Sequence, residues 1–364
     1  MKKSNIVYFS IILLISLITI VFVQHDEFLY KVPVGQITKV KNSPTVSQTD
    51  NFNNQDTQTT QALEATILNG KFKHKKVLIK NDFSSSNAFD QPYYKGQKVI
   101  LHLNNNHKTA TITNLKRDAS LAILLILAVD LLLVMKETGI RALFSLILNI
   151  ILFFTAIEID LGFQGQHVLL IFSFLTIIFS FLTLLFVLGW NPKMRLSFIT
   201  TIAGTFLAIM IALVVFHLTK QRGLHFETME YVTQNPQPLF LAEVLLGSLG
   251  AVMDESTDII ISLFAMIQQN PKISLAKLWQ SSRQIGKTIM GPLLNVLFMI
   301  FMADTFSMMV LYLRNGNSFG YSFTMNMALG FVQTLISGIG IVLTIPIASF
   351  LVGFYWRKWG LKHD

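Results

Sequence analysis

Long apolar stretches alternate with short polar ones over most of the chain, and one long polar stretch interrupts this pattern near the N-terminus. An α-helix needs about 20 mostly apolar residues to cross the hydrocarbon core of a bilayer. Eight stretches approach or exceed this length, and we predict that each is a transmembrane helix. They are residues 6–23, 120–135, 140–157, 168–188, 196–218, 239–267, 289–313 and 327–356. The pattern predicts an α-helical polytopic membrane protein.

The composition agrees with this prediction and excludes several other classes. With 52% hydrophobic and 13% charged residues and a mean hydropathy of +0.53, the chain is too apolar for an ordinary soluble enzyme. The net charge of +9 comes from basic residues spread among the loops, so we expect no nucleic-acid partner. The chain has no cysteine, and its 8 histidines are scattered, so we predict no disulfide, no metal site and no cofactor.

The distribution of basic residues predicts the topology. Residues 1–23 carry Lys2 and Lys3 before the apolar stretch and lack the small residues of a cleavage site, so we expect an uncleaved N-terminal anchor helix. Thirteen Lys and Arg residues fall in the segments predicted to lie inside, and three fall in the short outer loops. Because basic loops stay in the cytoplasm, both chain ends are predicted to lie there, in a bacterial cytoplasmic membrane.

The polar stretch 24–118 predicts a small extracytoplasmic β domain between the first two helices. Strand-like runs are separated by turn residues such as Asn69-Gly70 and Lys95-Gly96. The runs are 34–41, 62–68, 76–80, 98–103 and 109–115, and their spacing predicts an open barrel of about five strands, like an oligonucleotide/oligosaccharide-binding (OB) or SH3-like fold. Residues 42–61 have few apolar residues, which predicts a flexible loop. Residues 119–364 then form a seven-helix membrane domain.

The sixth helix concentrates polar residues at bilayer depth. Glu243, Gly247, Gly250, Asp254 and Asp258 follow one another at spacings of four or three, which places them on one side of a helix, the acidic face. The opposite side is apolar. A charged group inside a membrane usually faces other helices or water, so the acidic face predicts a cation or proton site.

Residues 254–258 also permit a different interpretation. The run of acidic and hydroxyl residues favours capping a new helix, so the sixth helix can be broken there, as in transporters whose broken helices bind ions. The alternative is a continuous, tilted helix whose Asp254 and Asp258 pair with a basic neighbour or lie near the inner surface.

A second cluster opens the seventh helix. Lys287, Gly291 and Asn295 share one side by spacings of four, and Gly291-Pro292 predicts a kink or an interruption. Lys287 is positioned in the sequence to neutralise an aspartate of the sixth helix. Residues 270–282 before it predict an amphipathic helix on the inner surface. Weaker polar candidates, each typical of an interhelical hydrogen bond, are Asp130, Asn149, Asp304, Asn326 and Gln333.

Several blocks of sequence resemble a known family. They are LLGSLGAVMD at 245–254, IGK at 285–287 and IMGPLLN at 289–295, with ILNGKF at 67–72 and YKGQKV at 94–99 in the polar domain. Together they resemble the YibE/F family of bacterial multi-pass membrane proteins. The resemblance implies a permease-like protein with a small β domain after its first helix, and it brings no substrate or catalytic residue. The family pattern after Asp254 is less acidic than residues 255–258, so the resemblance favours Asp254 over Glu255 and Asp258.

Three functions compete on the sequence. The first is a permease or permease subunit whose sixth and seventh helices line a path, with Asp254 as the cation or proton site. The second is a non-transporting sensor or assembly protein whose β domain binds a ligand or partner. The third, an intramembrane hydrolase using Asp254 and Asp258, is disfavoured because both lie on one helix, so we predict no enzyme. Besides the lipid bilayer, the glycine faces suggest a second copy or a paralogous subunit as partner.

Overall fold

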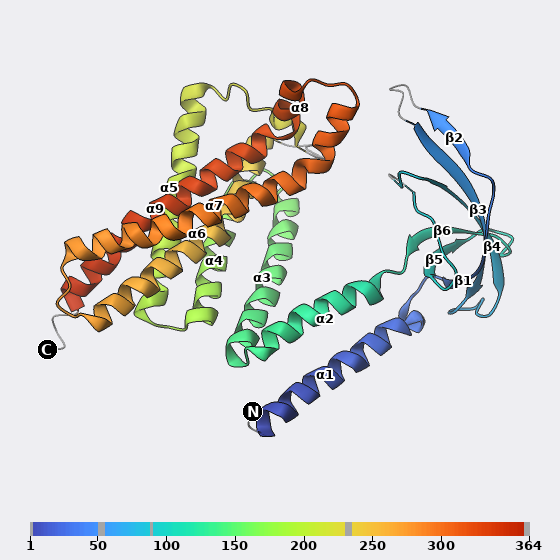
Figure 1. The fold of residues 1–364 in the computed structure, drawn as a ribbon, viewed down its shortest axis with the longest axis horizontal. Coiled ribbons are helices and arrows are strands. Elements are labelled where there is room, and N and C mark those ends of the chain that lie inside the picture. Colours follow the sequence, from blue (N-terminus) through green and yellow to red (C-terminus); the bar gives the residue numbers. More distant parts are fainter. Residues whose placement is uncertain (1–2, 50–54, 88–89, 230–234, 360–364) are drawn as a thin grey trace. The chain divides into compact units, whose positions relative to one another are not determined.

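The computed structural model describes residues 3–49, 55–87, 90–229 and 235–359. The chain forms two compact units, the N-terminal unit Met1–Gly139 and the C-terminal unit Ile140–Asp364. The N-terminal unit combines two helices with a β-sheet, whereas the described part of the C-terminal unit is helical (Figure 1).

The β-sheet of the N-terminal unit curls into a half-barrel. Its order is β2-β3-β1-β5-β6, with β4 paired to β3, and all these pairs are antiparallel. The edge strands β4 and β6 approach each other, because the backbone N–H of Leu78 donates to the carbonyl of Lys108 at 3.0 Å just before β6. The strands are β1 (Val34–Asn42), β2 (Val46–Thr49), β3 (Gln55–Ile67), β4 (Lys76–Ser84), β5 (Lys98–Leu103) and β6 (Ala110–Leu115).

The long strand β3 shows why this segment folds as a sheet. Its side chains alternate, so that Leu63, Ala65 and Ile67 are buried in the core while their neighbours are more exposed. Gln61 is also buried, and it is fully satisfied: its amide donates to Asn42 and to the Tyr93 carbonyl, and its oxygen accepts the Tyr93 N–H. Burial of a polar group at this position therefore costs little.

The segment 42–61 differs from the sequence prediction of a flexible loop. It contains β2 and the first part of β3, which pair in register from Val46 with Gln58 to Thr49 with Gln55. The interpretation was wrong because it considered only core burial. These residues include several Thr, which favours extended structure, and their backbone groups pair with each other and with β4 although their side chains are mostly exposed. Residues 50–54 lie outside the described part of the chain.

A buried lysine joins the β domain to the two helices of its unit. The Lys116 side chain is 2% exposed, and its ammonium group lies 2.7 Å from Asp26, 2.7 Å from Asp118 and 3.0 Å from the Val23 carbonyl. Tyr30 also donates a hydrogen bond to Asp118. Burial and this hydrogen bond raise the pKa of Tyr30 to about 12. The network ties the end of the first helix to the start of the second.

These helices, α1 (Lys3–Gln24) and α2 (Asp118–Val134), pack side by side in antiparallel directions. The Tyr8 hydroxyl donates to the Leu133 carbonyl, and the Ser16 hydroxyl lies 2.8 Å from Asp130. Asp130 is therefore held by an interhelical hydrogen bond, as expected for an isolated carboxylate on an apolar helix. Between the helices and the sheet lies the short 3₁₀ turn η1 (Glu27–Leu29).

The C-terminal unit contains helices that suit a membrane. Within the described part of the chain, six helices are long and apolar enough to cross one, namely α3, α4, α5, α6, α7 and α9. The chain is therefore a multi-pass membrane protein. The helices are α3 (Glu137–Gly162), α4 (Val168–Leu188), α5 (Pro192–Thr219), α6 (Pro236–Gln269), α7 (Leu275–Arg314), α8 (Phe319–Asn326) and α9 (Ala328–Trp359), with the 3₁₀ turn η2 (Phe226–Thr228) before α6.

Small residues allow α5, α6 and α9 to pack closely. A β-carbon at Gly340 of α9 would lie 2.9 Å from Val252 of α6, and one at Gly204 of α5 would lie 3.4 Å from the Gly340 carbonyl. Beside this crossing the hydroxyls of Thr201 and Ser256 lie 2.7 Å apart, fully buried. Close backbone approach and buried hydroxyl contacts are typical of helix packing in membranes.

Of the two alternatives that the sequence left open for the sixth helix, the structure has the continuous one, and the seventh helix is not interrupted at Gly291-Pro292. The helix α6 is continuous through residues 254–258, and Ser256 satisfies its hydroxyl on the Met253 carbonyl without ending the helix. The helix α7 is likewise continuous past Pro292. Its first turns replace the predicted surface helix at 270–282, because Ser274 caps α7 and Leu278, 2% exposed, packs into the core of this unit.

Candidate functional site

A cavity of about 640 Å³ lies at the end of the C-terminal unit where α6 and α9 begin and α7 ends. Its walls come from α3, α4, α6, α7, α8, α9 and η2. A volume of this size suits a small organic molecule. We call it the anionic pocket, for the reason given next.

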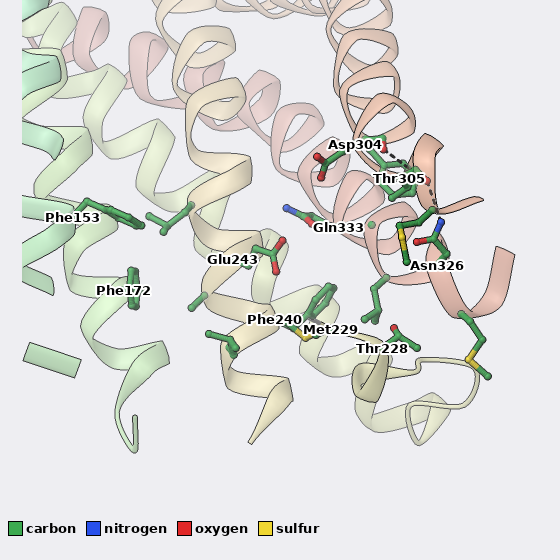
Figure 2. A pocket seen from close by; sticks show the side chains of 18 residues that line it. Phe153, Phe172, Thr228, Met229, Phe240, Glu243, Asp304, Thr305, Asn326 and Gln333 are labelled. Atoms are coloured by element: carbon green, nitrogen blue, oxygen red, sulfur yellow. Dashed lines mark hydrogen bonds between the residues drawn. The ribbon is translucent and has the colours of Figure 1, made fainter. Parts of the chain in front are cut away.

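Two carboxylates from different helices line this pocket. Glu243 of α6 points toward Gln333 of α9 and Asp304 of α7 (Figure 2). Among the described residues that line the pocket there is no Lys, Arg or His. The two acidic groups therefore have no basic partner in the lining, and when ionised they give the pocket a negative potential that favours a cation.

Amide groups add hydrogen-bonding capacity beside the carboxylates. The Asn326 side chain donates to the Thr305 carbonyl at 3.1 Å, which holds α8 against α7 (Figure 2). Gln333 lies against Gly247 of α6, where a β-carbon would be 2.7 Å from the Gln333 amide nitrogen. A β-carbon at position 247 would therefore displace the Gln333 amide from this place.

Aromatic rings and methionines form much of the remaining wall. The rings are Phe153, Phe172, Phe240 and Phe301, and the sulfur-containing side chains are Met229, Met308 and Met325. Aromatic faces attract cations, and apolar walls suit the carbon skeleton of a ligand. The lining is therefore chemically suited to a small organic cation, such as an amine, rather than to an anion.

The predicted acidic face of α6 extends from this pocket along the helix. Glu243, Gly247, Gly250, Asp254 and Asp258 are all exposed, whereas the residues opposite them are buried. At a rise of about 1.5 Å per residue the face is about 22 Å long. Of the five, Glu243 lines the pocket, Gly247 contacts Gln333, and the two aspartates lie farther along the same exposed side.

The predicted cluster on α7 does not join the acidic face. Asn295 lines a separate, mostly apolar groove between α7 and α9. Lys287 and Gly291 are exposed, and among the described residues no ion pair links Lys287 to Asp254 or Asp258. The predicted neutralisation by Lys287 was wrong, because the packed side of α7 runs through the neighbouring Gly286.

The weaker candidates divide into two groups. Asn149 of α3 donates to the Thr183 hydroxyl of α4 at 2.9 Å and is an interhelical contact, like Asp130. Asp304, Asn326 and Gln333 instead converge with Glu243 in the anionic pocket. Sequence spacing does not reveal this convergence, since the four residues come from four helices.

One carboxyl group deep in this unit was underrated from the sequence. Glu255 is 0% exposed, and neither of its side-chain oxygens has a hydrogen-bond partner. A signal was available, because Glu255 shares the buried side of α6 with Val252 and Ile259 by spacings of three and four. The stripe of Ser197, Thr201 and Thr205 on α5 was also missed, although its spacing of four is regular.

Two ranges of the chain match models of known protein families. Residues 123–358 match the family model of the YibE/F-like protein, and residues 28–115 match that of the YibE/F family N-terminal domain. Comparisons with curated proteins and with solved structures found no match. The first family match covers the anionic pocket, the acidic face and most of the helices, and the second covers the β domain. The chain therefore belongs to the YibE/F family.

Proposed function

We propose that this protein is a permease, or the subunit of one, that moves a small positively charged organic solute across the bacterial cytoplasmic membrane. The observation that supports this most directly is the anionic pocket, where Glu243 and Asp304 meet among aromatic rings without a basic residue in the described lining. Two carboxylates with aromatic walls provide ionic and cation–π attraction for the same ligand. No covalent step is part of this proposal.

The proposed topology has eight membrane spans. In addition to the six long helices, α1 and α2 cross as a hairpin, both chain ends lie in the cytoplasm, and the β half-barrel is an outer domain of the OB- or SH3-like kind. The anionic pocket then lies near the outer surface. The absence of cysteine from the chain makes this testable: a cysteine at Arg222 should react with an impermeant maleimide on intact cells, and one at Lys272 only after permeabilisation. The reverse pattern would invert the topology.

The acidic face supports a path from this pocket into the membrane. An exposed carboxylate at bilayer depth costs about 2.5 to 3.5 kcal/mol even on insertion scales, unless water or another protein surface covers it. Asp254 and Asp258 are exposed on α6. In the proposed function this side of α6 borders a water-filled path, completed by a second copy or by a paralogous subunit, along which the two aspartates exchange protons.

The test is ligand binding to the full-length protein in lipid nanodiscs. The probes are putrescine and tetraethylammonium, with glutarate as an anion of similar size. We expect the cations to raise the melting temperature and glutarate to leave it unchanged, and we expect Glu243→Gln to remove the effect. Glu158→Gln is the matched control, because Glu158 lies exposed on α3 and does not line the pocket. Equal responses from both variants, or no response to either cation, would refute the proposal.

A second candidate function rests on the β domain. A groove of about 880 Å³ in this domain is lined by Lys39, Lys41, Lys80 and Lys95, with Glu64 paired to Lys39. The excess of positive charge suits an acidic ligand, and such binding would support a sensor or assembly protein. In that case Lys41→Glu would abolish the cellular phenotype, whereas Glu243→Gln would leave it intact.

A further inference from the structure

The fully buried carboxyl group of Glu255 has no place in the anionic pocket and needs an explanation of its own. It lies on the packed side of α6, which adjoins the side that carries the exposed Asp258. A β-carbon placed at Gly286 would lie 3.7 Å from one of its oxygens and would clash with Ile345, so the carboxyl group faces the tight contact of α6 with α7 and α9. Neither oxygen has a hydrogen-bond partner in the described structure.

No described basic group neutralises this carboxyl. The helices α4, α5, α7 and α9 all pack against α6. No Asp, Glu, Lys, Arg or His occurs in α4 or in α9 before Arg357, and α5 carries Lys193, Arg195 and His217 only near its ends. On α7, Arg283 and Lys287 flank Gly286 and are exposed, and no ion pair joins them to Glu255 in the described residues.

A charged carboxylate in such a place is strongly disfavoured. Moving an ion out of water without a partner costs far more than a folded protein can offset, so the group binds a proton instead. A metal ion is a poorer fit, since no group of three His, Cys, Asp or Glu side chains gathers anywhere in the described chain. Hard cations need several oxygen ligands, whereas a proton needs only one.

The neighbouring residues provide a way for this proton to leave. Asp258 lies one turn along α6 and is exposed, and residues three apart on a helix have β-carbons about 5 to 6 Å apart. A proton can therefore pass from the Glu255 carboxyl group to the Asp258 carboxylate and from there to water, leaving Glu255 ionised until it is protonated again. The burial of Glu255 makes the ionised state short-lived in this packing.

We propose that Glu255 is a proton-binding site of the membrane domain, which exchanges its proton with the acidic face of α6 through Asp258. The inference rests on the proposed function, because it names the proton as the ion coupled to movement of the solute. It also differs from the expectation of the family resemblance, which placed any such role on Asp254.

Infrared spectroscopy of the full-length protein in nanodiscs tests this proposal. The wild type should show the C=O band of a protonated carboxyl group at neutral pH, and the band should be absent from Glu255→Gln and present in Glu158→Gln. It should disappear as the pH rises and should shift in D₂O, with slower exchange in Asp258→Asn. Glu255→Leu, which leaves no polar group buried, serves if Glu255→Gln does not fold.

Two results would overturn the proposal. A band that is equal in wild type and variant would show that Glu255 is ionised, and a band that neither titrates nor exchanges would show a permanently protonated structural group. The outcome is separate from that of the proposed function. If the band behaves as expected but no cation binds, the permease proposal fails alone; if cations bind but the band is missing, the proton site fails alone.

Discussion

Replacement of Lys116 by methionine should destabilise the N-terminal unit by about 3 kcal/mol. The Lys116 ammonium group lies within 3.0 Å of three acceptors, two of them the carboxylates of Asp26 and Asp118. Removing one partner of a buried ion pair costs about 3 to 5 kcal/mol, because the remaining charge is left uncompensated. The Asp118 side chain retains 28% exposure, so water compensates part of the loss and the lower end of this range applies.

Pulse proteolysis of the full-length protein in detergent measures this change. A loss of 3 kcal/mol raises the cleavable population of the N-terminal unit about 150-fold. All four tryptophans lie after residue 139, so tryptophan fluorescence reports on the C-terminal unit and should stay unchanged. Lys80→Met is the control: Lys80 is 73% exposed beside Asp82, and its loss should cost under about 1 kcal/mol. Equal cleavage of the two variants would refute the reasoning.

The same network predicts a pH profile. Although burial acts in the opposite direction, hydrogen bonds from Lys116 and Tyr30 hold the pKa of Asp118 below its ordinary value of 3.8. This contribution to stability is present above pH 3.8 and is lost as the pH falls below it. The pKa of Tyr30 is raised from 10.0 to about 12, so its contribution is present below pH 10.0 and is lost between there and about pH 12. If the N-terminal unit lost stability well inside the range from pH 3.8 to pH 10.0, this assignment would be contradicted.

Three further predictions concern the C-terminal unit. Glu243→Gln should weaken the binding of putrescine at least about tenfold by calorimetry, since a hydrogen bond to a charged group is worth about 1.5 to 3 kcal/mol; an unchanged affinity would place the ligand elsewhere. Gly247→Ala should also weaken binding, because its β-carbon displaces the glutamine amide, while the melting temperature stays within a few degrees. In a double-mutant cycle, Thr201→Val and Ser256→Ala should couple by about 0.6 kcal/mol. The value is modest because both hydroxyls also have backbone acceptors. A coupling near zero would show that the two hydroxyls do not hydrogen-bond to each other.

The sequence was a reliable guide where the physics is local. The apolar window 168–188 coincides with α4, and the strand predicted at 98–103 coincides with β5. Bilayer thickness and strand alternation act on successive residues, so length and period alone locate such elements. The family could be recognised for the same reason, since its motifs are short blocks within single elements.

Local patterns were a poorer guide to helix interruptions and to the site. Residues 254–258 and Pro292 carry strong local signals for a break, yet α6 and α7 run through them as continuous helices. In the same way the polar run 42–61 became paired strands, because the partner strands supply hydrogen bonds that composition does not reveal.

The sequence by itself determined that this is a multi-pass membrane protein with a small β domain and an acidic side on one helix. Only the tertiary structure decided which polar residues meet. Glu243 finds Asp304, Asn326 and Gln333 from other helices, while Glu255 is enclosed and Asn295 faces elsewhere. The physical reason is that periodicity specifies the direction of a side chain about its own helix, whereas the helix that covers it depends on close packing at positions such as Gly204 and Gly340.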